Sequence, residues 1–123
     1  MRIGVYGSLR RGQPLHRVIS SEKYIGNVLV DGYDLYADLS KQSYPFIKKG
    51  DGKVLMEVYD VHPAIGDQVG RIEESAGYRT DTIEIEGMPS FEAYVHDEAD
   101  VHGNKLGTHD WIEYKNNFYL KRR

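Results

Sequence analysis

The chain opens on a strand-like run that leads into the segment Val5-Tyr6-Gly7-Ser8-Leu9-Arg10-Arg11-Gly12. A strand that ends in Gly-Ser exposes backbone N–H groups that no neighbouring strand takes up. Such groups bind carboxylates or phosphates, and glycine lets a ligand approach the backbone closely. We therefore predict that this segment forms one wall of a small-ligand pocket, with Arg10 or Arg11 adding positive charge at its mouth. An ordinary tight turn is the alternative, and the spacing excludes a Walker A loop.

A second candidate site follows the best helical pattern in the chain. The pattern begins near Pro63, repeats apolar residues up to Ile72, and meets a stop signal at Gly77. Glu73 directly follows Ile72 and lies at the edge of the apolar stripe. Partial burial there would raise its pKa from about 4.3 towards the range useful for a general base. Glu74 lies one step further round the helix, where we expect exposure to solvent.

The rest of the chain is rich in strand patterns. We expect strands over 24–30, 33–36, 44–47, 53–61, 78–85 and 91–96, with turns at 31–32, 50–52 and 87–89. Residues 13–20 are expected to form one or two helical turns, and the chain after 96 is loop-like as far as Trp111-Ile112. Many strands with one principal helix predict an α+β domain, in which strands curled into a barrel would enclose a ligand cavity.

Length and composition limit the classes of function. The 123 residues predict a single domain covering 1–123. The net charge of -3 and the lack of an extended basic face argue against nucleic-acid binding. Without cysteine the chain has no disulfide, thiolate metal site or cysteine nucleophile, and no apolar run approaches the roughly 20 residues that span a bilayer. The start shows no signal-peptide pattern, so we expect a cytoplasmic protein without membrane contact.

Other catalytic arrangements find little support. The five histidines show no recognised ligand spacing, so no metal is expected. Ser8 has no histidine nearby in sequence to activate it, which leaves a serine-hydrolase interpretation without a base.

These residues together resemble the γ-glutamylcyclotransferase-like superfamily, which includes the γ-glutamylamine cyclotransferases, the plant avirulence-induced proteins and a group of small bacterial proteins. The opening segment resembles the family's signature substrate loop. The other matching segments are Tyr44-Pro45, the strand Gly52–Val61 with its Glu-Val-Tyr, the helix and Tyr-x-Arg strand over Val69–Arg79, and Asp110-Trp111-Ile112. Their order and spacing cover almost the whole chain.

The resemblance implies a small mixed β-barrel with flanking helices. It also implies that the loop holds the α-carboxylate end of a γ-glutamyl group, while a glutamate moves a proton as the substrate closes to 5-oxoproline and expels an amine. No cofactor is needed for this reaction. On the matched positions, the residues implied to bind substrate are Tyr6, Gly7, Ser8, Leu9, Arg10, Tyr44 and Tyr78.

The helix departs from the family's Leu-Asp-x-x-Glu-Gly pattern, because this chain has Val69-Gly70-Arg71-Ile72-Glu73-Glu74. Alignment of the apolar positions puts Glu73 in the catalytic place, whereas counting back from Tyr78 favours Glu74. Met56 stands where the family usually has glycine, which would narrow or reshape the cavity.

Two functional hypotheses follow from these observations. The first is an enzyme that releases 5-oxoproline from a small γ-glutamyl amine or amino acid by glutamate acid/base catalysis. The alternative is a non-catalytic binding module for a small acidic metabolite. An interaction domain with an empty barrel ranks third, because it would not explain the tyrosines around the loop.

Overall fold

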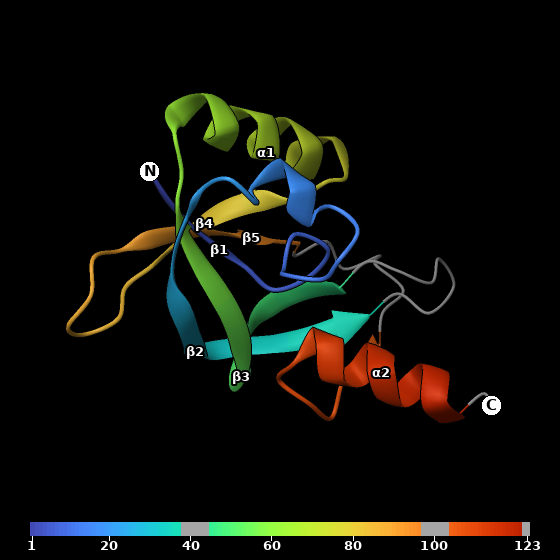
Figure 1. Cartoon of the computed structure of the whole chain (residues 1–123). Helices are drawn as coiled ribbons and strands as arrows, with labels where there is room; N and C mark the ends of the chain where they lie inside the picture. Colours follow the sequence, from blue (N-terminus) through green and yellow to red (C-terminus); the bar gives the residue numbers. More distant parts are fainter. Residues whose placement is uncertain (38–44, 97–103, 122–123) are drawn as a thin grey trace.

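The computed structural model describes residues 1–37, 45–96 and 104–121 (Figure 1). These residues form strands and helices in the α+β class that the sequence predicts. In chain order the elements are β1 (Arg2–Val5), the 3-10 helix η1 (His16–Val18), β2 (Lys23–Ala37), β3 (Pro45–Asp60), α1 (Pro63–Ser75), β4 (Arg79–Ile83), β5 (Phe91–Val95), β6 (Asn104–Lys105) and α2 (Trp111–Lys121).

The strands form one mixed sheet in the order β4-β5-β1-β3-β2-β6. β1 runs parallel to β5 and antiparallel to β3, which places the first strand in the interior of the sheet. The Tyr33 hydroxyl on β2 donates a hydrogen bond to Asp81 Oδ2 on β4 over 3.0 Å. Because β2 and β4 lie near opposite ends of the strand order, this contact shows that the sheet curls round. Within the described residues the end strands β4 and β6 do not pair, so the sheet is curved like a barrel but not closed.

The prediction of turns at residues 31–32 and 50–52 is wrong. β2 and β3 run through these positions as one long hairpin, with a register shift between Asp31 and Tyr33. A Cβ atom on either Gly50 or Gly52 would collide with the Asp34 carboxylate. The two glycines therefore make room for a neighbouring side chain within an irregular ladder and do not reverse the chain.

The buried side chains form two clusters, one on each face of the sheet. Ile3 and Val5 of β1 pack with Val69 of α1, whereas Met56 belongs to the cluster that contains Trp111 of α2. Accordingly, α1 at the top of Figure 1 and α2 at the lower right lie on opposite sides of the sheet. β1 is therefore buried on both faces, and the segment that follows it leaves the sheet from inside the molecule.

The helix α2 begins where the expected loop ends, and the sequence patterns alone predict no helix over its residues. Its start is fixed by Asp110, whose Oδ1 accepts hydrogen bonds from the amides of Ile112 at 2.9 Å and Glu113 at 3.2 Å. Such a carboxylate satisfies amides that have no partner inside the helix. Among the described residues, no helix has the length and apolar character needed to cross a membrane.

Candidate functional site

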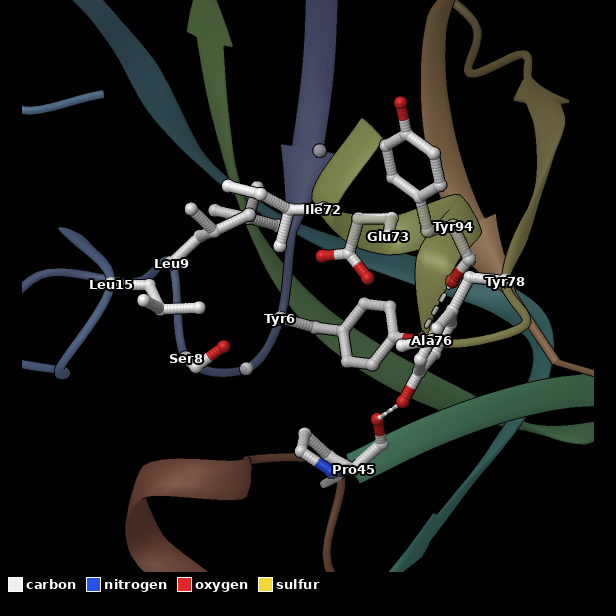
Figure 2. Close-up of a pocket in the computed structure, with 13 residues that line it drawn as sticks. Tyr6, Ser8, Leu9, Leu15, Pro45, Ile72, Glu73, Ala76, Tyr78 and Tyr94 are labelled. Carbon is white, nitrogen blue, oxygen red and sulfur yellow. Dashed lines mark hydrogen bonds between the residues drawn. The ribbon is translucent and has the colours of Figure 1, made fainter. Parts of the chain in front are cut away.

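A cavity lies between the end of β1, the end of α1 and the strand β5 (Figure 2). Its empty volume is about 550 Å³, including the open solvent at its mouth. The cavity is lined by Gly4, Val5, Tyr6, Gly7, Ser8, Leu9, Leu15, Pro45, Ile72, Glu73, Ala76, Tyr78 and Tyr94. It thus brings together most of the site residues that the sequence predicts, from segments about 70 residues apart.

Residues 6–9, which we call the ligand loop, form one wall of this cavity. Their carbonyl groups are engaged, because Gly7 O accepts from the Arg10 amide at 3.0 Å and Ser8 O accepts from the Leu15 amide at 2.9 Å. Leu9 O is held by His16 Nδ1 at 2.9 Å. No hydrogen bond between described residues uses the amides of Ser8 or Leu9. Free amides beside a cavity are suited to bind an anionic oxygen.

The glycine of the ligand loop has a packing reason that sequence reasoning missed. A Cβ atom on Gly7 would lie 2.6 Å from Cγ of Pro45, and Pro45 is itself buried. The neighbouring Tyr6 hydroxyl donates to Tyr94 O at 2.7 Å. Burial raises the pKa of Tyr6, with further contributions from Tyr78 and Glu73. The loop is therefore fixed from both sides, by Pro45 and by β5.

Glu73 projects its carboxyl group from α1 into the cavity above Tyr6 (Figure 2). Burial raises the pKa of Glu73 from 4.5 to about 7. Among the described residues this carboxyl group has neither an ion pair nor a hydrogen bond, so little offsets the loss of solvent. Glu74 is exposed and does not line the cavity. The geometry therefore favours Glu73 of the two glutamates.

The end of α1 explains why Glu73 and Tyr78 meet at one cavity. The Tyr78 amide donates to Glu73 O at 3.1 Å and the Gly77 amide donates to Glu74 O at 3.0 Å. With Gly77 at a φ of 93°, this is a Schellman motif. The reversal brings Tyr78 back to the cavity, where its hydroxyl donates to Pro45 O at 2.7 Å.

Arg10 is not among the residues that line the cavity, contrary to the expected positive charge at the mouth. It is 5% exposed, and it pairs with Glu57 through Nε at 2.8 Å and with Asp110 through a terminal nitrogen at 2.8 Å. The guanidinium of Arg11 lies 3.8 Å from the ring centre of Tyr24, and Arg11 does not line the cavity either. Tyr44 lies outside the described residues. Met56 lies in the core and does not narrow this cavity.

Glu57 is a site-supporting residue that sequence reasoning missed. Its carboxylate accepts hydrogen bonds from Arg10 Nε at 2.8 Å, the Tyr59 hydroxyl at 2.7 Å and the Arg11 amide at 3.1 Å. Burial alone would raise the pKa of Glu57, but these donors outweigh that effect and hold it below its ordinary value. The signal available in the sequence was a single charge between Met56 and Val58 in the otherwise uncharged run 54–59.

Tyr94 was also missed, although it lines the cavity from β5. Phe91, Ala93 and Val95 belong to the buried cluster that contains Trp111. Because side chains alternate along a strand, Tyr94 lies on the opposite face, towards the cavity. No group of three or more potential metal ligands occurs among the described residues.

Comparison with known proteins shows which family this chain resembles. A family profile described as "Gamma-glutamyl cyclotransferase, AIG2-like" matches residues 3–113. The gamma-glutamylcyclotransferase family protein YtfP of Escherichia coli is 31% identical over 114 residues, which span 92% of this chain and 97% of YtfP. Its solution structure has a TM-score of 0.72 at 27% identity and covers 94% of this chain and 99% of that one.

The protein PH0828 of Pyrococcus horikoshii is 39% identical over 79 residues, which span 64% of this chain and 65% of PH0828. Its crystal structure covers 100% of this chain and 99% of that one, with a TM-score of 0.84 and 28% identity. The fold alone is shared with part of Kluyveromyces lactis allophanate hydrolase, at a TM-score of 0.77 and 19% identity over 95% of this chain and 21% of the hydrolase. Because the profile matches most of the chain and YtfP is 31% identical over 92% of it, the chain belongs to the gamma-glutamyl cyclotransferase, AIG2-like family.

Proposed function

We propose that this protein is a γ-glutamylcyclotransferase that converts a small γ-glutamyl amine or γ-glutamyl amino acid into 5-oxoproline and the free amine. The observation that carries the proposal is the position of Glu73, whose carboxyl group faces the cavity beside the ligand loop and has no ion pair or hydrogen bond with any residue that the structure describes. Family membership supports the reaction type. A fold can host several functions, so the proposal rests on the site.

The ligand loop would hold the substrate's α-carboxylate through the amides of Ser8 and Leu9. This contact would place the α-ammonium group of the substrate towards Glu73. A carboxyl group with a pKa of about 7 is ionised in part of the molecules at neutral pH and can both accept and return a proton.

The reaction then needs three proton movements and no cofactor. Ionised Glu73 takes a proton from the α-ammonium group, and the freed amine forms a bond to the γ-carbonyl carbon of the same molecule. The bond from that carbon to the leaving nitrogen breaks as Glu73 returns the proton to that nitrogen. The new ring nitrogen still carries one surplus proton, which passes to the released amine or to water, so that neutral 5-oxoproline lactam and the protonated amine are formed. Because the nucleophile is intramolecular, the protein mainly folds the substrate into its reactive shape.

The direct test is incubation with a panel of γ-glutamyl amines and γ-glutamyl amino acids, with 5-oxoproline release measured by chromatography. Glu73→Gln keeps the size of the side chain but cannot accept the proton, so we expect its kcat to fall by at least about 100-fold. Glu74→Gln is the matched control, because it removes the same charge from the next, exposed position. Its kcat should stay within about twofold of the original.

The mechanism is wrong if Glu73→Gln releases 5-oxoproline as fast as the unmodified protein. No release from any compound, together with saturable binding of one of them, would favour the binding-module alternative.

A further inference from the structure

The ligand loop continues into a buried ionic cluster that the proposed reaction does not use. Arg10 directly follows the loop, and its guanidinium lies between Glu57 of β3 and Asp110, the residue before α2. The two partners are 47 and 100 residues away in the sequence. The side chains of Arg10 and Glu57 are 6% and 5% exposed, and that of Asp110 is 21% exposed.

Both carboxylates have further donors that fix their positions. Glu57 also accepts from the Arg11 amide, so it holds the backbone of this segment as well as the guanidinium. Asp110 Oδ1 accepts from the amides of Ile112 and Glu113 at the start of α2. The cluster has one cation and two carboxylates, and the partial positive charge at the helix N-terminus helps balance the excess.

Two other contacts tie the start of α2 to the same region. The Leu55 amide on β3 donates to His109 O at 2.8 Å. Lys115 Nζ donates to Gln13 Oε1 at 2.9 Å, which links the first turns of α2 to the chain just after the ligand loop. The helix is therefore held on β3 and contacts the segment 10–13 at two points.

We propose that Asp110 is a positioning residue for the ligand loop, acting through Arg10. Asp110 does not line the cavity and does not contact Glu73, yet it binds the guanidinium of Arg10. The backbone amide of Arg10 closes the turn over residues 7–10 by donating to Gly7 O. Through Arg10, the start of α2 thereby restricts the movement of the loop amides that would bind a carboxylate. A charge-assisted hydrogen bond is about twice as strong as a neutral one, so the charge of Asp110 contributes to this anchoring.

The test compares Asp110→Asn with Glu113→Gln. Asparagine is as good a helix N-cap as aspartate, so Asp110→Asn should keep α2 while weakening the contact with Arg10. Glu113→Gln removes the same charge from the same helix turn at an exposed position without contact to Arg10. Amide hydrogen exchange followed by NMR reports on the loop through Arg10, Arg11 and Leu15, whose amides are hydrogen-bonded.

We expect exchange at these three amides to be about fivefold faster in Asp110→Asn than in Glu113→Gln, with the α2 amides equal in both. Equal exchange at the three amides in both variants would overturn the inference. Acceleration spread evenly over α2 and the loop would also overturn it, because that pattern indicates only a weakened cap. If Asp110→Asn is too unstable to measure, Asp110→Ser keeps a strong cap and gives the same comparison.

A kinetic readout accompanies the exchange data and rests on the proposed function. A loop that binds the α-carboxylate equally in the ground state and the transition state affects KM and not kcat. We therefore expect Asp110→Asn to raise KM about fivefold with kcat within twofold. If the unmodified protein releases no 5-oxoproline, the proposed function fails while the exchange experiment still decides the role of Asp110.

Discussion

At the scale of single residues, Glu73 is a carboxyl group whose ionised form is destabilised by burial. It carries a carboxyl group into a largely apolar cavity, and its pKa rises to about 7 because burial penalises the ionised form. The pKa of the buried Glu57 carboxylate is instead lowered, because Arg10 and two further donors stabilise its charge. One carboxylate is thus held charged to build the site, and the other is left free to exchange a proton.

This difference has a measurable effect on stability. The pKa of Glu73 is raised on folding, so the folded protein binds its proton more tightly than the unfolded chain and loses stability as pH rises from about 4.5 to about 7. Glutamine is never ionised. We expect Glu73→Gln to leave the free energy of unfolding nearly unchanged at pH 4.5 and to raise it by up to about 3 kcal/mol at pH 8.

Urea unfolding of both proteins between pH 4.5 and 8 measures this difference, and Glu74→Gln again provides the control. A Glu73→Gln effect that is the same at both ends of the range would show that the carboxyl group titrates normally.

At the scale of elements, the reversal at the end of α1 positions two cavity residues at once. Gly77 has a φ of 93°, in the left-handed region, and a Cβ atom there would lie 2.8 Å from Nε2 of His96. His96 in turn contacts the ring of Tyr78 edge-on, with ring centres 5.2 Å apart. The helix end, Tyr78 and the end of β5 are therefore packed as one unit.

We expect Gly77→Ala to lower the free energy of unfolding by about 2–3 kcal/mol, from backbone strain plus the displacement of His96. Gly87→Ala is the matched control, because Gly87 has a φ of 87° but nothing within 4 Å of its added Cβ atom. Backbone strain alone should cost this variant about 1 kcal/mol. Chemical denaturation checks both values, and equal losses would show that the His96 contact has no cost.

At the scale of the whole molecule, the curl of the sheet depends on contacts between strands that are not hydrogen-bonded neighbours. The Tyr33 hydroxyl donates to Asp81, and burial together with Asp81 raises the pKa of Tyr33 to about 12. This bond joins β2 to β4, which are not neighbours in the strand order.

Removal of that bond should loosen the whole molecule. We expect Tyr33→Phe to lower the free energy of unfolding by about 1–2 kcal/mol, because the hydroxyl is largely buried and its acceptor is charged. Tyr24→Phe is the control, since its hydroxyl binds the nearby exposed Asn27 at 2.7 Å and should contribute less than about 0.5 kcal/mol. Thermal and urea unfolding measure both, and a larger loss for Tyr24→Phe would contradict this account of the curl.

The same scales separate what the sequence could predict from what it could not. The strand β1 and the helix α1 follow from local periodicity, and the structure confirms both. The same periodicity puts Glu73 at the edge of the buried stripe, and in the structure Glu73 lines the cavity. The helix α2 could not be predicted from local periodicity, because its start depends on Asp110 and on the burial of Trp111 against distant strands. Arg10 was misplaced for the same reason, since nothing local indicates partners 47 and 100 residues away.

The interior position of β1 also bears on how the protein is made. A ribosome synthesises this strand and the ligand loop before both neighbours of β1 in the sheet, the partners of Arg10 and the carboxyl group of Glu73. During translation β1 can therefore pair only after β3 and β5 have been made, and Arg10 gains its second ion-pair partner only after Asp110 has been made. A chain truncated just before residue 110 should therefore keep every residue that lines the cavity but lack the Asp110 contact that holds Arg10 beside the ligand loop.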